Sequence, residues 1–490
     1  MDQSVADIRQ RSAVALIGVF VLIGFAVRCL AAQGGLWTDE AWSLVYAQRA
    51  GDALGVLTRI NHDNNHHLNS WWLQLVGPEA PPLLMRGLSI VTSSITIWVA
   101  ARIGLRRDRL TGMITAALFA LSPIMVVYGS EARGYAPMML ALMIMIGRID
   151  IWLEDRTYPK PILLLALCAL AGSLAHLTML PAVAMLAIWA CLAGARTDGP
   201  VKSAKLTIEL LGPALAVSFL FLCIVFIIAI RSETGLQVGG YIPFMWPLFA
   251  LAISNLLTFS TGIGYAWNLS GWMTLAIAAV GAAMLFTRWQ MPTERKWFYA
   301  ILILTMPVVV AVLGLGNSQY PRYYLPAAAT ILLLLAEWIG QYSTRHPLAR
   351  IGAAGILTLL LGSALMQNYQ LIVSQRGHPE NAVNTIAKAA PAGADVTIAQ
   401  ARASAMLKVA AAGQRYPLNI MLAKCGAARF HFIAGIARKN RLRVLPECDS
   451  SMRLVAFGDA EGPSGESWSL YLQQALPRRI VAVSSAPSRQ

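Results

Sequence analysis

Trp37-Thr38-Asp39-Glu40-Ala41-Trp42-Ser43 follows closely on an apolar run, Ala13 to Leu30, and places two adjacent carboxylates just beyond it. The run approaches the roughly 20 apolar residues that a helix needs to cross a bilayer. Because desolvating a carboxylate is costly, acids kept this close to hydrocarbon indicate a functional role. We therefore predict a membrane-spanning helix that leads into a loop with chemically active groups at the membrane surface.

The composition predicts an all-α polytopic membrane protein. Of the 490 residues, 57% are hydrophobic and only 13% are charged, and the mean hydropathy is +0.57, which is typical of multi-pass chains and not of soluble enzymes. About 11 apolar segments are long enough to be transmembrane helices. They cover residues 13–32, 84–102, 110–127, 135–152, 161–176, 180–194, 206–230, 269–287, 298–315, 323–340 and 350–371. The stretch 242–260, which prolines interrupt, is expected to lie in or on the membrane without crossing it.

Lysine and arginine in the short loops predict the orientation. With the N-terminus in the cytoplasm, the inner segments hold about 17 of these residues and the outer ones about seven, as the positive-inside rule requires. The first long loop, residues 33–83, then lies outside, and so does the C-terminal segment. The net charge of +15 is explained largely by this asymmetry, so it does not call for a nucleic-acid partner.

Residues 376–490 have a more mixed composition than the expected transmembrane domain, residues 1–375, and predict a small α/β domain on the outer face. Strand-like runs occupy 395–400, 429–433, 452–457 and 479–483, and helix-like stretches occupy 401–413 and 467–475. Cys425 and Cys448 are the pair of cysteines in this domain. In an oxidising compartment they could form a disulfide, although spacing alone does not decide it.

Polar residues from distant parts of the chain fall on the outer side. Tyr128 to Tyr135, with the sequence Tyr-Gly-Ser-Glu-Ala-Arg-Gly-Tyr, links the third and fourth spans. His176 stands near the outer end of the fifth span. Asn317 to Tyr324, with the sequence Asn-Ser-Gln-Tyr-Pro-Arg-Tyr-Tyr, links two late spans. Together with the first loop they predict one site at one depth of the membrane.

The acid pair, the Tyr-x-x-Glu-Ala-Arg-x-Tyr link and the Arg-Tyr pair before a late span resemble the GT-C glycosyltransferases. The resemblance covers roughly residues 10–340 and is strongest to the protein O-mannosyltransferase and lipid A aminoarabinose transferase group. It implies inverting transfer of a sugar from a polyprenyl-phosphate donor to an acceptor on the outer face. It also implies that Asp39, the first acid of the pair, is the catalytic carboxylate.

Each candidate residue has a functional and a structural interpretation. Asp39 would take the acceptor's proton if desolvation raises its pKa; alternatively, it caps the helix that follows. Arg322 is expected to bind the donor phosphate, with Arg133 mainly organising the site. Either arginine could instead snorkel to the interface, and Arg133 could pair with Glu131. His176 is either a phosphate contact or a satisfied polar helix residue.

The remaining candidates are assigned to a sugar and acceptor pocket: Glu40, Asn65, His66, His67, Glu131, Tyr135 and Tyr323. His62 and His66 are four residues apart and would share a helix face. With Glu40 or Asp63 they could hold a divalent cation such as Mg, Mn or Zn. The asparagine-rich run around them is equally suited to hydrogen-bonding sugar hydroxyls, and the two interpretations stay open.

The partners expected are a polyprenyl-phosphate-linked sugar, membrane lipid, and a cell-envelope glycan, lipid or protein as acceptor. The expected location is a bacterial plasma membrane. A polytopic flippase or transporter of lipid-linked sugars would share the hydropathy, but no repeated half-structure is evident. An inactive membrane scaffold would not explain why the acids, histidines and arginines gather on one face. A GT-C enzyme that transfers a preassembled oligosaccharide remains a close alternative.

Overall fold

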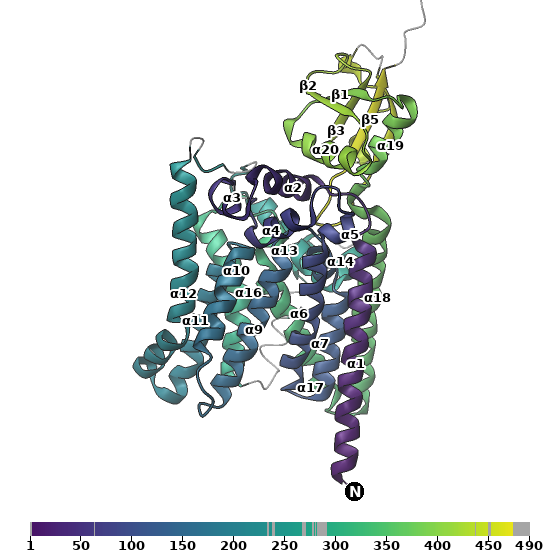
Figure 1. Ribbon diagram of the computed structural model, residues 1–490. Coiled ribbons are helices and arrows are strands. Elements are labelled where there is room, and N and C mark those ends of the chain that lie inside the picture. Colours follow the sequence, from purple (N-terminus) through teal and green to yellow (C-terminus); the bar gives the residue numbers. More distant parts are fainter. Residues whose placement is uncertain are drawn as a thin grey trace, which may run out of the picture.

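The long helices form a bundle, and a small sheet domain stands on the end of the bundle opposite the N-terminus (Figure 1). The computed structural model describes residues 2–62, 64–232, 235–237, 241–266, 271–276, 279, 281, 292–436, 438–448 and 452–473. Short helices lie between the bundle and the sheet domain (Figure 1).

Within the described residues, eight helices are long and apolar enough to cross a membrane. They are α1 (Asp2–Ala31), α6 (Gly87–Leu105), α9 (Tyr135–Glu154), α11 (Met179–Asp198), α12 (Pro200–Arg231), α16 (Thr293–Leu313), α17 (Leu325–Ser343) and α18 (Pro347–Ser374). A ninth apolar segment consists of α7 (Arg109–Leu121) and α8 (Pro123–Gly129), which are bent by 57° at their junction. The bend falls at Pro123, which cannot continue the hydrogen-bond ladder of α7. Shorter apolar helices are α10 (Ile162–Ala175), α13 (Trp246–Thr261) and α14 (Ile263–Ala266).

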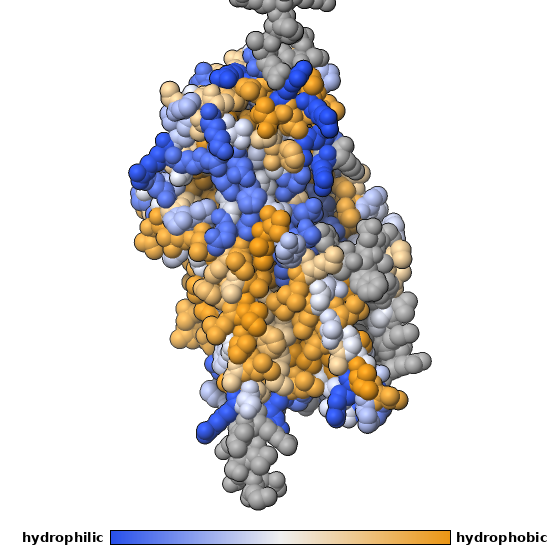
Figure 2. Space-filling model, turned by 90° about the vertical axis from the view of Figure 1, so that its right-hand side faces the viewer, coloured by the Kyte–Doolittle hydropathy of each residue, from blue (hydrophilic) through white to orange (hydrophobic). Residues whose placement is uncertain are grey.

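The multi-pass, all-helical membrane architecture that the composition predicted is thus confirmed. Each predicted span overlaps one of these helices or the bent pair, except 269–287, most of which lies outside the described residues. The stretch 242–260, expected not to cross, contains α13, which is shorter than the spanning helices. On the face shown in Figure 2, a broad apolar band covers the helical part between more hydrophilic regions above and below it. Such a band is the surface that lipid would cover.

Four short helices follow α1 at the end that carries the sheet domain: α2 (Thr38–Ala50), α3 (Ala53–Thr58), α4 (His67–Val76) and α5 (Pro82–Met85). The Glu40 carboxylate accepts a hydrogen bond at 3.3 Å from the backbone N–H of Trp37, which precedes α2. Glu40, and not Asp39, therefore supports the start of this helix, so the capping alternative for Asp39 is wrong. Asp52 caps α3 by accepting from Gly55 N at 2.6 Å.

The C-terminal domain is a five-stranded mixed sheet with the order β2-β1-β3-β5-β4. Its elements are β1 (Ala394–Ile398), β2 (Leu418–Leu422), β3 (Phe430–Ala434), β4 (Met452–Gly458), β5 (Trp468–Gln473), α19 (Glu380–Ala389) and α20 (Ser404–Gly413). The short 3-10 turns are η1 (Pro321–Tyr324), η2 (Gln375–Gly377), η3 (Ala401–Ala403), η4 (Arg438–Asn440) and η5 (Pro446–Cys448). Strand β1 pairs in parallel with β2 and β3, whereas β5 pairs antiparallel with β3 and β4.

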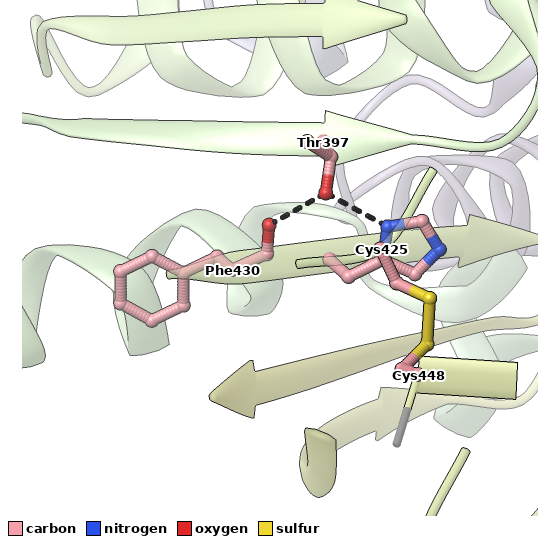
Figure 3. The surroundings of a disulfide bond; sticks show 5 residues. Thr397, Cys425, Phe430 and Cys448 are labelled. Atoms are coloured by element: carbon pink, nitrogen blue, oxygen red, sulfur yellow. Dashed lines mark hydrogen bonds between the residues drawn. A yellow bond between two sulfur atoms is a disulfide. The ribbon is translucent and has the colours of Figure 1, made fainter. Parts of the chain in front are cut away.

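The predicted strands at 395–400, 429–433 and 452–457 and the helix at 401–413 are confirmed by β1, β3, β4 and α20. The helix predicted at 467–475 is wrong, because this segment forms β5 inside the sheet. The run 479–483 lies outside the described residues. Cys425 and Cys448 are joined by a disulfide, with Cα atoms 5.7 Å apart, beside the strand residues Thr397 and Phe430 (Figure 3).

The sheet domain shares a hydrophobic core with the short helices beneath it. One cluster of buried side chains includes Leu36 and Leu44 from the first loop, and Phe430, Phe432 and Trp468 from the sheet. Burial of apolar side chains contributes about 25 cal/mol for each Å² removed from water. The first loop and the sheet domain are therefore packed as one unit above the bundle.

Arg376, in η2, ties the same unit to the bundle through a fully buried guanidinium group. It donates to Ala31 O at 2.6 Å, Val127 O at 3.1 Å and Ser130 Oγ at 2.8 Å. It also donates to Ser464 Oγ of the sheet domain at 3.2 Å. These bonds fix the sheet domain next to the links that carry the predicted site residues.

Candidate active site

A cavity of about 470 Å³ lies where the bundle, the short helices and the sheet domain meet. Its walls come from segments that are far apart in the sequence. It is lined by Asp39, Trp42, Tyr46, His62, Asn64, Asn65, His66, Arg133, Tyr135, His176, Leu177, Thr178, Asn317, Tyr320, Arg322, Tyr323 and Arg402. The fold therefore brings together the first loop, the α8–α9 link, the α10–α11 link and the segment before α17, as the sequence predicted.

Asp39 lies in the first turn of α2 and contacts three arginines. Its Oδ2 atom pairs with Arg133 Nη1 and lies 3.0 Å from Arg322 Nη1. Its Oδ1 atom lies 3.6 Å from Nη2 of Arg402. Arg133 therefore pairs with Asp39 and not with Glu131, and neither Arg133 nor Arg322 is a snorkelling anchor.

Arg133 is held in place by several neighbours besides Asp39. It donates to Asn64 Oδ1 at 2.7 Å and, through Nε, to His66 Nε2 at 3.2 Å. Its guanidinium lies 5.2 Å from the centre of the Tyr135 ring, and its backbone carbonyl accepts from Ser89 Oγ at 3.0 Å. This set of contacts fits the organising role predicted for Arg133.

His66 and His176 form one wall of the cavity, with their rings stacked 5.0 Å apart. Burial, and after it the nearby arginines, lowers the pKa of His66 well below its usual value and the pKa of His176 to about 3. Both rings are therefore neutral at physiological pH. Gly134 allows this packing, because a Cβ atom there would lie 1.7 Å from Ala175 O.

Arg322 enters the cavity from η1 between two aromatic rings. Its guanidinium lies 4.2 Å from the ring centre of Tyr320 and 5.5 Å from that of Tyr323. Its Nε atom is buried and has no hydrogen-bond partner within the described part of the chain. Cation–π contacts help to hold the group, and its Nε–H is left for a ligand.

The electrostatics correct one expectation for Asp39. Burial by itself raises the pKa of this carboxyl, but Arg133, Arg322 and Arg402 together hold the pKa below its usual value. The base role predicted for Asp39 required that desolvation raise its pKa. In the free protein this condition is not met, because three cations surround the carboxylate, which makes it a stable anion and a weak base.

Glu40, assigned to the pocket and to a metal, lies outside the cavity lining. Its carboxylate accepts from Arg86 Nε at 2.8 Å, Arg86 Nη2 at 2.6 Å and Ala132 N at 2.7 Å. Within the described residues, His, Cys, Asp and Glu side chains form no group of three that could hold a metal ion. Asp63 lies outside the described residues. The predicted set of Glu40, His62 and His66 therefore does not fit a metal, because Arg86 already occupies the Glu40 carboxylate.

Glu131 and His67 are also placed outside the cavity lining. Glu131 is fully buried and accepts from the Ser464 hydroxyl of the sheet domain. Burial raises its pKa above the usual value. His67 packs edge-on against Phe221, with ring centres 5.2 Å apart, and burial lowers its pKa to about 4. Neither side chain lines the cavity, so both belong to the packing around it.

Besides Tyr46 of α2, one charged lining residue, Arg402, had no place in the sequence prediction of the site. It lies in η3 of the sheet domain, and its backbone carbonyl accepts from Trp42 Nε1 at 2.9 Å. No local motif marks it, because only the packing of the sheet domain on α2 brings it to the cavity. Asn64 lies in the asparagine-rich run considered for sugar hydroxyls, and Asn317 and Tyr320 lie in the segment Asn317 to Tyr324, although no individual role was predicted for them.

No family model matches this chain, and no curated protein matches it in sequence. By structure it is similar to ArnT, the lipid A aminoarabinose transferase, from Cupriavidus metallidurans. The apo crystal structure of that protein aligns with a TM-score of 0.57 at 10% identity, over 94% of this chain and 98% of that one. Its crystal structure bound to undecaprenyl phosphate aligns with a TM-score of 0.51 at 13% identity, over 93% and 97% of the two chains. These alignments confirm the predicted GT-C-like fold with its small C-terminal sheet domain.

Proposed function

We propose that this protein is an inverting glycosyltransferase that moves a sugar from a polyprenyl-phosphate donor to a cell-envelope glycan, lipid or protein. The observation that carries the proposal is the convergence of one carboxylate and three arginines in a cavity at the end of a membrane bundle. A lipid-linked donor needs a cationic site for its phosphate within reach of apolar helices. The undecaprenyl phosphate bound to ArnT, which has the same fold, supports a polyprenyl donor.

The arginines supply the donor side of the site. Arg322 has an unpartnered Nε–H in the described structure and faces the cavity, so it is assigned to the phosphate. Arg133 supports it with a second positive charge and a fixed position. Charge-assisted hydrogen bonds from guanidinium groups to phosphate stabilise the negative charge that develops on a leaving phosphate.

The reaction proceeds as a displacement at the anomeric carbon. The acceptor hydroxyl oxygen forms a bond to this carbon while the bond from the carbon to the phosphate oxygen breaks. The electron pair of that bond leaves with polyprenyl phosphate, and the hydroxyl proton passes to Asp39. Neutral His66 and His176, with Asn64, Asn65, Tyr135 and Tyr323, can hydrogen-bond the sugar hydroxyls.

The acceptor is assigned to the side of the sheet domain. Arg402 belongs to that domain and reaches Asp39, so an acceptor held by the domain would meet the base directly. We place the site and the sheet domain on the outer face of a bacterial plasma membrane, with the N-terminus in the cytoplasm. The excess of arginine and lysine in the opposite loops supports this orientation.

The proposal is tested by sugar transfer from radiolabelled undecaprenyl-phosphate sugars to envelope extract, with purified protein in nanodiscs. Wild-type protein is expected to transfer label, and Asp39→Asn and Arg322→Ala are expected to lose it. Glu79→Gln and Arg231→Ala change exposed residues outside the cavity lining and are expected to retain it. Full activity in Asp39→Asn would refute the base assignment. Movement of labelled donor across the membrane without transfer would instead favour a flippase.

A further inference from the structure

The two arginines closest to Asp39 differ in how many groups hold them: Arg133 is fixed, whereas Arg322 is free to exchange its anion. Arg133 is bound by Asp39, Asn64 and His66 together. Within the described chain, the Arg322 side chain makes one hydrogen bond, at 3.0 Å to Asp39 Oδ2. Only that bond must be given up for Arg322 to turn toward another anion in the same cavity.

The contacts of Arg322 favour this exchange. Its guanidinium is held by ring faces of Tyr320 and Tyr323, which tolerate small rotations better than a bidentate ion pair does. Its Nε–H is already desolvated without a partner in the described structure. An unsatisfied buried donor is destabilising, so a phosphate oxygen arriving there supplies the hydrogen bond that Nε–H lacks.

We propose that Asp39 and the donor phosphate compete for Arg322, so that donor binding removes a cation from Asp39 and converts the carboxylate into the base. The inference deepens the proposed function and rests on it. In the free protein Asp39 is neutralised by its arginines and takes up protons poorly. Once the phosphate engages Arg322, Asp39 keeps Arg133 and the more distant Arg402 but loses one cation and gains a negative neighbour. Both of these changes favour proton uptake.

Thermodynamic reciprocity makes the exchange measurable without turnover. If the phosphate weakens the pairing of Asp39 with Arg322, the Asp39 charge must weaken phosphate binding by the same factor. Removing that charge is therefore expected to tighten phosphate binding. A carboxylate that merely orients the arginines would have the opposite effect, because its loss would disorder the phosphate site.

The probe is undecaprenyl phosphate, titrated calorimetrically into the full-length protein in nanodiscs at pH 8. Asp39→Asn is expected to bind it at least about fivefold more tightly than wild type, the lower end of typical coupling. Glu466→Gln is the matched control. Glu466 is a partly buried carboxyl that accepts from the Thr38 hydroxyl, next to Asp39, and it makes no ion pair with Arg322 in the described structure. Its affinity is expected to stay within about twofold of wild type.

Arg322→Ala is expected to bind at least about tenfold more weakly, and in the Asp39→Asn/Arg322→Ala double variant the gain from Asp39→Asn is expected to vanish. Unchanged or weaker binding by Asp39→Asn would overturn the exchange. So would an equal gain in Glu466→Gln, or a gain that persists without Arg322. Asp39→Ser replaces Asp39→Asn if thermal unfolding shows that the latter is misfolded. Absence of binding in every variant, wild type included, would refute the proposed function and the exchange with it, whereas binding without the gain refutes the exchange alone.

Discussion

Arg86 and Glu40 form a fully buried ion pair that fixes the start of α2. Removing the arginine tests how much this pair contributes to the stability of the protein. Both side chains are 0% exposed, and Arg86 Nη2 lies 2.6 Å from Glu40 Oε2. Arg86 also donates to Ala32 O at 2.9 Å, Gly34 O at 2.5 Å and Gly35 O at 3.0 Å. One guanidinium therefore organises the whole turn between α1 and α2.

Arg86→Met keeps most of the side-chain volume but leaves Glu40 buried without its cation. Breaking a buried pair in this way costs about 3–5 kcal/mol. Because three backbone carbonyls lose their donor as well, we expect a loss of unfolding free energy near the upper end, about 5 kcal/mol. In Glu40→Gln/Arg86→Met neither partner of the pair is left charged and buried, and at least about 2 kcal/mol is expected to return through the coupling of the two sites.

The pH dependence of the unfolding free energy provides a second test of the Arg86–Glu40 pair. In the wild type, burial raises the pKa of Glu40, but Arg86, with smaller contributions from Arg376 and the Ala132 N–H, more than offsets this, so the pKa lies below its usual value. The carboxylate therefore contributes stability near neutral pH that is lost as the pH falls through that lowered pKa. In Arg86→Met the uncompensated burial raises the pKa, so the penalty is expected to shrink as the pH falls.

The assay is reversible unfolding by SDS titration from detergent micelles, followed by far-UV circular dichroism at several pH values. Arg59→Met is the control, because its pairing with Asp52 is exposed to solvent, and it is expected to change stability by less than about 1 kcal/mol. A loss below about 1 kcal/mol in Arg86→Met would refute the reasoning. A penalty that does not change with pH, or that the double variant leaves intact, would show that the cost does not come from Glu40.

Three further predictions follow from the site and the sheet domain. Gly134→Ala places a Cβ atom 1.7 Å from Ala175 O, so it is expected to displace His66 and His176. The kcat is expected to fall by at least about tenfold in steady-state kinetics, while a thermal melt shows that the protein remains folded. Serine at both Cys425 and Cys448 opens a crosslink with a sequence separation of 23 and is expected to destabilise the sheet domain by about 3 kcal/mol, measured by proteolysis and unfolding of the whole chain. Finally, the arginines hold the pKa of Asp39 low in the free protein. The acid limb of kcat/KM is therefore expected below the usual pKa of an aspartate, and that of kcat at higher pH if the donor draws away a cation. Coincident limbs would argue against the exchange.

The segments that cross the membrane could be predicted because hydrophobicity is a local property. An apolar run of sufficient length forms a helix in lipid whatever its neighbours are, since its backbone must satisfy its own hydrogen bonds there. The same holds for the polar links, which are found by exclusion between the apolar runs. Asp39, Arg133, His176 and Arg322 could thus be assigned to one end of the bundle before any contact between them was known.

The sheet domain shows where local pattern fails. Residues 467–475 have a composition compatible with a helix, yet Trp468 to Gln473 form β5, which is paired on both sides by β3 and β4. Strand formation depends on partners that are distant in sequence, so periodicity within one segment does not decide it. Strands β1, β3 and β4 could be predicted because they contain β-branched and aromatic residues, which favour strands.

The sequence by itself determined the membrane architecture, the disulfide candidates and the set of polar groups at one end of the bundle. Only the tertiary structure decided which carboxylate faces the cavity, because Asp39 and Glu40 are neighbours in sequence but pair with different arginines. It also brought Arg402 to Asp39 across 363 positions of chain. The physical reason is that burial and solvation follow from the residue types along a segment, whereas charge pairing and pKa depend on distances of a few ångström that packing alone sets.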